Sequence, residues 1–312
     1  MNKFLVTGGA GFIGSNICRK LISDGFFVRV VDNLLTGKES NLAGVLDKIE
    51  FIEADMGDPV VAAKAMEGID VVLHQGALPS VPRSIDDPAA THRHCENATF
   101  TLLLAARDAK IKRFVYAASS SAYGDTPTLP KIETMPVNPL SPYAAAKLMG
   151  EYYCSVFYKV FGLETVSLRY FNVFGPQQDP TSQYAAAIPA FVTSILKNEP
   201  PTIYGDGEQS RDFTYIDNVV EANLLAARAK KTEGQVVNVA CGEAITVNAI
   251  IAMINDITGK SVKPIYAPPR KGDVKHSLAD ITAAKKLLNF KPVMLFKDGL
   301  RKAIDWYREN LL

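Results

Sequence analysis

The first 170 residues alternate short apolar runs with longer segments in which apolar positions recur at helical spacing. This pattern predicts strands over 4–6, 28–31, 51–55, 71–74, 114–118 and 165–170, and helices from 12, from 58–59, over about 90–109 and over 142–161. Strands and helices that alternate at this spacing predict an α/β fold with a doubly wound, parallel sheet. Ligands of such sheets bind beyond the carboxyl ends of the strands.

The turn after the first predicted strand is rich in glycine. Gly8, Gly11 and Gly14 form a G-x-x-G-x-x-G spacing, and Asp32 stands at the end of the second predicted strand. Such a turn lets backbone N–H groups approach a pyrophosphate and directs a helix N-terminus at its charge. A carboxylate at position 32 can accept hydrogen bonds from a ribose diol and would repel a 2′-phosphate. The turn and the acid together predict a site for NAD rather than NADP.

Other residues near the predicted strand ends are expected to lie along the same cofactor. Thr36 and Gly37 follow Asp32 in a polar turn and are placed beside the adenosine, while Asp55 ends the third strand beside the adenine pocket. The remaining expected cofactor contacts are Phe12, Ile13, Asn33, Met56, Gln75, Ala77, Tyr143, Lys147, Tyr170 and Val173.

The regular alternation ends near residue 171, beyond which proline and glycine interrupt the pattern repeatedly. We therefore expect a NAD-binding Rossmann domain over 1–170 and a smaller, discontinuous α/β substrate lobe over 171–312. Segments near 211–240 are expected to return to the first domain, and the apolar run at 236–239 is the candidate strand. Trp306 and Tyr307 lie in a final amphipathic helix and are expected to be packing residues.

Composition narrows the classes of partner. The chain is 47 % hydrophobic and 21 % charged with a formal charge of +1, which offers no electrostatic reason to bind nucleic acid or an anionic membrane. Four widely spaced cysteines without a C-x-x-C pair predict free thiols in a reducing compartment. No apolar run is long enough to span a bilayer, and a first strand beginning at 3 or 4 leaves no room for a signal peptide, so a cytoplasmic location is expected.

A metal centre is not expected. His92 and His94 stand two residues apart without a matching cluster of acids or cysteines, and they are assigned to a helix start.

The candidate chemistry lies in the predicted helix 142–161. Tyr143 and Lys147 form a Y-x-x-x-K pair, and i,i+4 spacing places both side chains on one helix face. A neighbouring ammonium and a positive nicotinamide ring are expected to lower the pKa of the phenol. Ser119, at the end of the fifth strand, can bond the reacting oxygen and relay a proton. These groups beside NAD predict removal of hydride from a secondary alcohol.

The chain resembles the extended short-chain dehydrogenase/reductase family over essentially its whole length. The resemblance rests on the glycine turn, Asp32, SSSAYG at 119–124, SPYAAAK at 141–147 and RYFNVFGP at 169–176. Within the family the chain is similar to nucleotide-sugar 4-epimerases, which keep NAD bound and act on a UDP-hexose. The resemblance implies that Tyr143 is the base, that Lys147 tunes it, and that Ser119 completes the triad. It also implies a 4-keto sugar that turns over before hydride returns.

The resemblance also implies contacts to the UDP-sugar. Asn172 matches a family contact to the diphosphate, Arg211 and Arg270 match arginines that neutralise it, and Tyr204 is placed to meet the uracil. The other expected substrate contacts are Ser80, Arg83, Ser119, Ser120, Tyr143, Ala186 and Ser277.

By resemblance, a tyrosine at position 277 is typical of relatives that are restricted to UDP-glucose and UDP-galactose. This chain has the small Ser277 there and the small Ala186 in the matching sugar pocket, which favours a sugar with an N-acetyl group. Conversion of UDP-N-acetylglucosamine to UDP-N-acetylgalactosamine is therefore the expected reaction. Pro79 departs from the glycine that close relatives often carry, so the loop with Ser80 and Arg83 is expected to sit differently.

Alternative functions remain open at this point. They are 4-epimerisation of UDP-glucose/UDP-galactose or UDP-glucuronate, decarboxylation of UDP-glucuronate, and a NAD-binding regulator without turnover. Ser120 and Ser121 occupy the positions at which a 4,6-dehydratase needs an acid pair, which argues against elimination. A homodimer is expected by resemblance, with the helices near 90–109 and 143–161 paired between subunits.

Overall fold

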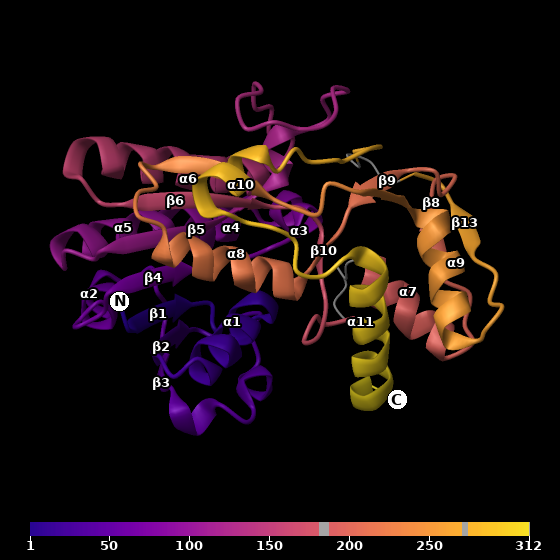
Figure 1. Cartoon of the computed structure of the whole chain (residues 1–312), viewed down its shortest axis with the longest axis horizontal. Helices are drawn as coiled ribbons and strands as arrows, with labels where there is room; N and C mark the ends of the chain where they lie inside the picture. Colours follow the sequence, from indigo (N-terminus) through magenta and orange to yellow (C-terminus); the bar gives the residue numbers. More distant parts are fainter. Residues whose placement is uncertain (181–186, 270–273, 312) are drawn as a thin grey trace.

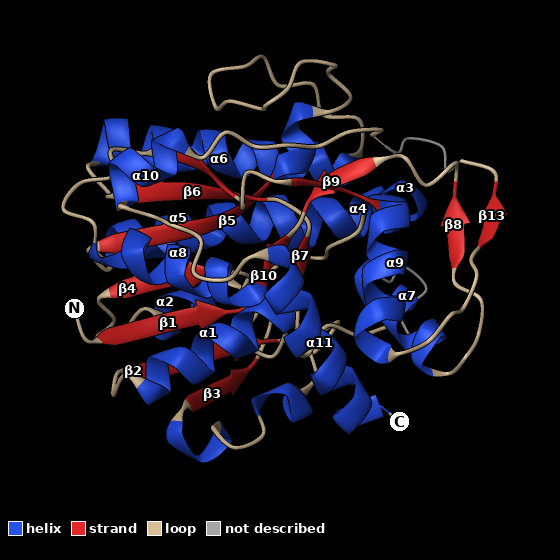
Figure 2. Cartoon of the chain, turned by 45° about the vertical axis from the view of Figure 1, so that its right-hand side comes forward, coloured by secondary structure: helices blue, strands red, loops and turns tan. Residues whose placement is uncertain are grey.

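A seven-stranded sheet forms the centre of the computed structural model, which describes residues 1–180, 187–269 and 274–311. Every neighbouring pair of strands runs parallel, in the order β11-β6-β5-β4-β1-β2-β3 (Figures 1 and 2). This order confirms the predicted doubly wound sheet. The strands are β1 (Lys3–Thr7), β2 (Phe27–Asp32), β3 (Glu50–Glu53), β4 (Val71–His74), β5 (Arg113–Ser119), β6 (Thr165–Tyr170) and β11 (Gln235–Val239).

Side chains that alternate along each strand feed two cores, one on each face of the sheet. Val6 and Leu73 belong to the core under α1 (Phe12–Ser23) and α8 (Ile216–Arg228). Leu5 and Val72 point to the opposite core, which is covered by three helices. Those helices are α2 (Pro59–Ala65), α5 (Ala98–Asp108) and α6 (Pro142–Phe161).

The helix predicted over 90–109 is interrupted. A short α4 (Pro88–Thr91) runs into a π-helical segment, His92–Asn97, before α5 begins. A π-helical turn widens the helix by one residue and is frequent at functional sites. His92 and His94 lie in this π-helical segment, which begins four residues after the start of α4.

The apolar run at 236–239 lies within β11, which pairs with β6 and so returns the chain to the sheet. Most of the rest of the C-terminal part packs beside the sheet and lies to its right in Figure 1, whereas the helix over 282–288 lies over the sheet and contacts β11. The helices and strands of this part are β7 (Val173–Phe174), α7 (Ala187–Leu196), β8 (Thr202–Tyr204), β9 (Ser210–Asp212), β10 (Thr214–Tyr215), β12 (Ala244–Thr246), α9 (Val247–Thr258), β13 (Ile265–Ala267), α10 (Thr282–Leu288) and α11 (Phe296–Leu311).

One apolar core continues from the sheet into this lobe, since Val6 and Leu168 belong to the same cluster as Val192, Ile250 and Leu300. The division at residue 170 stays a prediction. No helix in the described ranges combines the length and the apolar character needed to cross a bilayer.

Candidate active site

The glycine turn after β1 is closed to side chains. Gly8 has φ 67°, and a Cβ added there would lie 2.6 Å from the Cα of Gly76. A Cβ on Gly14 would lie 2.1 Å from the Gly8 carbonyl oxygen, so α1 packs against the turn only because residue 14 is glycine. No described side chain caps the N-terminus of α1. These features leave a bare cradle of backbone at a helix N-terminus, which fits a pyrophosphate.

The Asp32 carboxylate is held rigidly at the end of β2. It accepts hydrogen bonds from the backbone N–H groups of Ala10 and Leu34, each at 2.9 Å. Burial raises the pKa of this carboxyl, and the two backbone hydrogen bonds oppose that rise. A Cβ on Gly37 would lie 3.0 Å from both carboxylate oxygens, so this glycine keeps the carboxylate open to the cavity. The carboxylate is thus placed to accept from a ribose diol.

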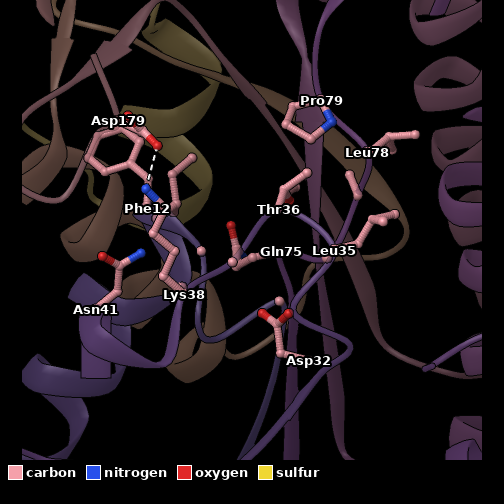
Figure 3. Close-up of a pocket in the computed structure, with 18 of the residues that line it drawn as sticks. Phe12, Asp32, Leu35, Thr36, Lys38, Asn41, Gln75, Leu78, Pro79 and Asp179 are labelled. Carbon is pink, nitrogen blue, oxygen red and sulfur yellow. Dashed lines mark hydrogen bonds and ion pairs between the residues drawn. The ribbon is translucent and has the colours of Figure 1, made fainter. Parts of the chain in front are cut away.

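A cavity of about 1000 Å³ runs past the glycine turn and Asp32 and reaches Tyr143 and Lys147. Figure 3 shows Asp32 among the residues that line it. Its volume and backbone cradle fit NAD. The expected cofactor residues that line it are Gly8, Gly11, Phe12, Ile13, Gly14, Asp32, Asn33, Thr36, Gly37, Met56, Gln75, Ala77, Tyr143, Lys147 and Tyr170.

Two expected cofactor contacts lie elsewhere. β3 ends at Glu53, and the Asp55 carboxylate turns back to accept from the Gly57 N–H at 2.8 Å, so its neighbours Ala54 and Met56 line the cavity instead. Val173 lies in β7 and lines the adjoining cavity.

Sequence reasoning missed the residues that close the cavity from the C-terminal part. Trp306 and Asn310 of α11 line it, so Trp306 is not only a packing residue. Asp179 reaches across to Lys38, and their side chains form an ion pair with Nζ and Oδ2 2.6 Å apart (Figure 3). No local motif marks these positions, because only the packing of the chain brings them to the cavity.

Helix α6 presents the candidate catalytic pair. Ser141 caps the helix by accepting from the Ala144 N–H at 3.1 Å, which fixes Tyr143 in the first turn. Lys147, one turn later, is buried, and its Nζ donates to the Ala117 carbonyl at 2.8 Å. Ser119, at the end of β5, lines the same cavity as Tyr143, and its hydroxyl accepts from the Ser121 hydroxyl at 2.8 Å. The structure therefore brings together the three groups that the sequence predicted.

The pKa of Tyr143 differs from the expectation. Burial raises it well above the usual range for tyrosine, charge on Cys95 adds to the rise, and the hydrogen bond with Ser119 opposes it. Burial also lowers the pKa of Lys147. The chain alone therefore keeps the phenol protonated, and Lys147 does not offset the loss of solvation as predicted. The positive charge of the oxidised cofactor, when it is bound, would lower the pKa of Tyr143.

A second cavity, of about 800 Å³, meets the first at Tyr143 and Ser80, which line both. The backbone of Ser80 is strained, with φ 112°. The expected substrate residues that line the second cavity are Ser80, Ser119, Ser120, Tyr143, Asn172, Arg211 and Ser277.

Four expected substrate contacts are not among them. Arg83 lies one turn into α3 (Val81–Asp86), whose N-cap is Ser80, and it lines the cofactor cavity instead. Tyr204 lines neither cavity, because β8 pairs with β13 away from Tyr143 and leaves its side chain exposed. Ala186 and Arg270 lie outside the described residues. Sequence reasoning missed Tyr123, Lys131 and His276, which do line the second cavity.

Within the described ranges, no three His, Cys, Asp or Glu side chains come together to hold a metal ion.

Comparison with known proteins places this architecture in the extended short-chain dehydrogenase/reductase class. The model of the NAD dependent epimerase/dehydratase family matches residues 4–240. The chain belongs to this family, is an NAD-dependent enzyme as predicted, and has NAD as its cofactor.

Two solved structures and one curated relative illustrate the similarity. The UDP-N-acetylglucosamine 4-epimerase of Methanobrevibacter ruminantium, solved with UDP-N-acetylmuramic acid, is 40 % identical, has a TM-score of 0.95, and covers 99 % of each chain. A UDP-glucuronic acid 4-epimerase of Bacillus cereus, solved with UDP-glucuronic acid and NAD, is 34 % identical with a TM-score of 0.91 and covers 98 % of this chain and 99 % of that one. A putative UDP-glucose 4-epimerase of Methanocaldococcus jannaschii is 38 % identical over 98 % of each chain.

Proposed function

We propose that this protein is an isomerase that inverts C4 of a UDP-hexose, with UDP-N-acetylglucosamine and UDP-N-acetylgalactosamine as the preferred pair. The observation that carries the proposal is the position of Tyr143, which lines both cavities where they meet, with Ser119 in the lining of the second one. A secondary alcohol in the second cavity would face the phenol with the cofactor cavity beside it. The relatives from Methanocaldococcus jannaschii and Methanobrevibacter ruminantium are named as UDP-sugar 4-epimerases, which supports the same reaction class.

Each step assigns a task to a residue of this chain. Tyr143 takes the proton of the sugar 4-hydroxyl, and Ser119 bonds the same oxygen and passes the proton. When bound, NAD accepts a hydride from C4 and returns it. Inversion requires the 4-keto sugar to turn about its diphosphate link, so the protein must grip the nucleotide firmly and the hexose loosely.

The grip is assigned to Asn172 and Arg211. The Asn172 amide donates to the Asp212 carbonyl at 3.0 Å, and Arg211 donates to the Ser210 and Lys275 carbonyls at 3.0 Å. Both side chains are thus oriented where they line the second cavity. A guanidinium is well suited to a diphosphate.

The preference for an N-acetyl sugar rests on Ser277. Its N–H donates to the Ser210 carbonyl at 3.0 Å, which fixes a small side chain in the wall of the second cavity. The 40 % identical structural relative, a UDP-N-acetylglucosamine 4-epimerase, supports this choice.

A uronic acid sugar is the second candidate. Lys131, Arg211 and His276 line the second cavity, and its described lining contains no acidic residue. A relative that is 34 % identical is a UDP-glucuronate 4-epimerase. Such a lining would accommodate a carboxylate in addition to the diphosphate.

Incubation with UDP-N-acetylglucosamine, UDP-glucose and UDP-glucuronate in turn, followed by proton NMR, tests the proposal. We expect an epimer of unchanged mass without added nicotinamide cofactor, formed fastest from the N-acetyl sugar. Tyr143→Phe should keep its NAD and lose at least a hundredfold in rate. A product lighter by carbon dioxide would identify a decarboxylase. If neither the unsubstituted protein nor Tyr143→Phe converted any of these sugars while both still bound NAD, the protein would be identified as a regulator.

We also propose that the protein acts as a homodimer through α5 and α6, whose outward faces carry large exposed apolar side chains such as Phe100, Tyr152 and Val156.

A further inference from the structure

A buried histidine at the end of β4 takes no part in the chemistry described above. His74 is fully buried and lies directly opposite Thr7 in the parallel register of β1 and β4. Its Nδ1 is 2.6 Å from the Thr7 hydroxyl, and its Nε2 is 2.9 Å from the Thr99 hydroxyl of α5. Both ring nitrogens therefore have partners on other segments of the chain.

The neighbouring hydrogen bonds fix which nitrogen carries the proton. The Thr99 hydroxyl donates its only hydrogen to the Cys95 carbonyl at 2.5 Å, so it must accept from His74 Nε2. Burial lowers the pKa of His74 well below its usual range, and the charge of Lys147 lowers it further, so the ring is neutral. Nδ1 is then an acceptor, and the Thr7 hydroxyl donates to it.

The result is a hydrogen-bond chain in which each group donates to the next. The Gly76 N–H donates to Thr7 at 3.4 Å, Thr7 donates to His74, His74 donates to Thr99, and Thr99 donates to the Cys95 carbonyl. It begins in the loop after β4 and ends in the π-helical segment His92–Asn97.

The hydrogen-bond chain begins and ends in segments that line the cofactor cavity. Thr7 precedes Gly8, and the backbones of Gly8 and Gly76 are in close contact. In the π-helical segment His94 lines the same cavity, and Cys95 accepts from the Leu78 N–H at 3.3 Å. Cys95 also packs in the apolar cluster that includes Tyr143. The chain therefore connects the pyrophosphate turn to the wall beside the candidate base.

We propose that His74, as the neutral Nε2–H tautomer, is a positioning residue that locks the glycine turn, the 75–78 loop and the π-helical segment into one cofactor-binding frame. A histidine suits this task because one ring accepts on one side and donates on the other. The inference rests on the NAD site and not on the proposed sugar chemistry, and neither readout below requires sugar turnover.

The first test measures how fast bound NAD exchanges with labelled NAD in the purified holoenzyme. Thr7→Val removes one hydroxyl from the chain and His74→Gln removes the acceptor at Nδ1, so each should accelerate exchange roughly five- to tenfold. Thr7→Ser keeps the hydroxyl and should exchange like the unsubstituted protein.

Thr165→Val is the matched control for mere loss of a buried hydrogen bond. The Thr165 hydroxyl is equally buried and donates to the Cys154 carbonyl at 2.7 Å, but it lies at the start of β6 and does not line the cofactor cavity. Its removal should lower stability without changing NAD exchange. If Thr7→Val exchanges NAD no faster than Thr165→Val, the proposal is overturned.

The second test observes the imidazole directly in the unsubstituted protein. Nitrogen NMR of histidine-labelled protein should show one ring with a protonated Nε2 and a bare Nδ1 that does not titrate near neutral pH, and this signal should vanish in His74→Gln. A cationic ring, or the Nδ1–H tautomer, would overturn the assignment.

Discussion

The Tyr143 side chain is partly buried and lines both cavities, so the fold and a bound cofactor both affect the pKa of its phenol. The fold raises the pKa of the phenol, so Tyr143 is a proton donor until a positive charge is placed beside it. The same burial makes that charge effective, because a low-dielectric site strengthens electrostatic interactions. We therefore propose that the oxidised cofactor, when bound, converts Tyr143 into a base.

We expect the ultraviolet titration of Tyr143, taken as the difference between the unsubstituted protein and Tyr143→Phe, to depend on the redox state of the nicotinamide. With the reduced cofactor, the phenolate signal should be absent at neutral pH. With the oxidised cofactor, the apparent pKa should fall, so that phenolate and turnover both rise with pH from the acid side. Identical titrations in the two redox states would contradict the idea that cofactor charge activates the base.

Asp212 gives a second prediction, on stability. Its fully buried carboxylate accepts from the Cys241 and Gly242 N–H groups at 3.0 Å, yet burial raises its pKa to about 6 from 3.8. Since the folded pKa is the higher one, this group stabilises the fold below the unfolded pKa, and the contribution is lost as pH rises through about 6. The full effect is about 3 kcal/mol.

Denaturant unfolding at pH 4 and pH 7 measures this effect. The free energy of unfolding of the unsubstituted protein relative to Asp212→Asn should be lower at pH 7 than at pH 4, because the amide does not ionise. The exposed Asp47→Asn should show no such trend. A relative stability that increases toward pH 7 would contradict a raised pKa of Asp212 in the folded state.

Among the elements, the segment 175–180 acts as a strap across the cofactor cavity. Its backbone carbonyls accept from Asn16 of α1 at Pro176 (3.1 Å) and from Tyr307 of α11 at Gln178 (3.0 Å). The Lys38–Asp179 ion pair then joins the strap to the loop after β2. These contacts hold the strap in place at the cofactor cavity, which suits retention of bound NAD.

Lys38→Ala should speed the exchange of bound NAD about two- to fivefold, and raising the salt concentration should shrink the difference, because the pair is solvent-exposed. Lys112→Ala is the matched control, since Lys112 and Asp70 form a similarly exposed pair at the same 2.6 Å distance outside the cavity. Equal rates of NAD exchange in Lys38→Ala and Lys112→Ala would contradict a role of the Lys38–Asp179 ion pair in retaining NAD.

The contrast between strap and glycine turn shows what a sequence can reveal. Gly8 and Tyr143 were predictable because each belongs to a short motif. Gly8 and Gly14 have the spacing of a glycine-rich turn, and Tyr143 and Lys147 have the spacing of one helical turn. The side chain of Asp55 was misplaced, because a strand end fixes a residue's position but not the direction of its side chain. The π-helical segment was missed because one inserted residue hardly changes the apolar pattern. Asp179 and Trp306 reach the cavity only through tertiary packing.

At the scale of the whole molecule, helix α6 has two faces with separate duties. Its inner face carries Tyr143, Lys147 and Glu151, and Glu151 makes a buried two-pronged ion pair with Arg169 of β6 at 2.7 and 2.9 Å. Its outer face carries Met149, Tyr152, Val156 and Val160, an exposed apolar stripe at helical spacing. An interface on the stripe would support the catalytic helix from behind.

Val156→Glu is expected to convert the proposed dimer into a monomer, because it places a charge in the centre of this stripe, where desolvation is costly. Light scattering coupled to size-exclusion chromatography measures the mass of each form. Val60→Glu makes the same change on α2, at a side chain that is 77 % exposed and away from the stripe, and it should remain dimeric. A mass of 33.9 kDa for the unsubstituted protein would reject the dimer. If Val156→Glu lost both the dimer and the activity while its NAD content stayed unchanged, the interface on the outer face of α6 would be shown to position Tyr143 on the inner face.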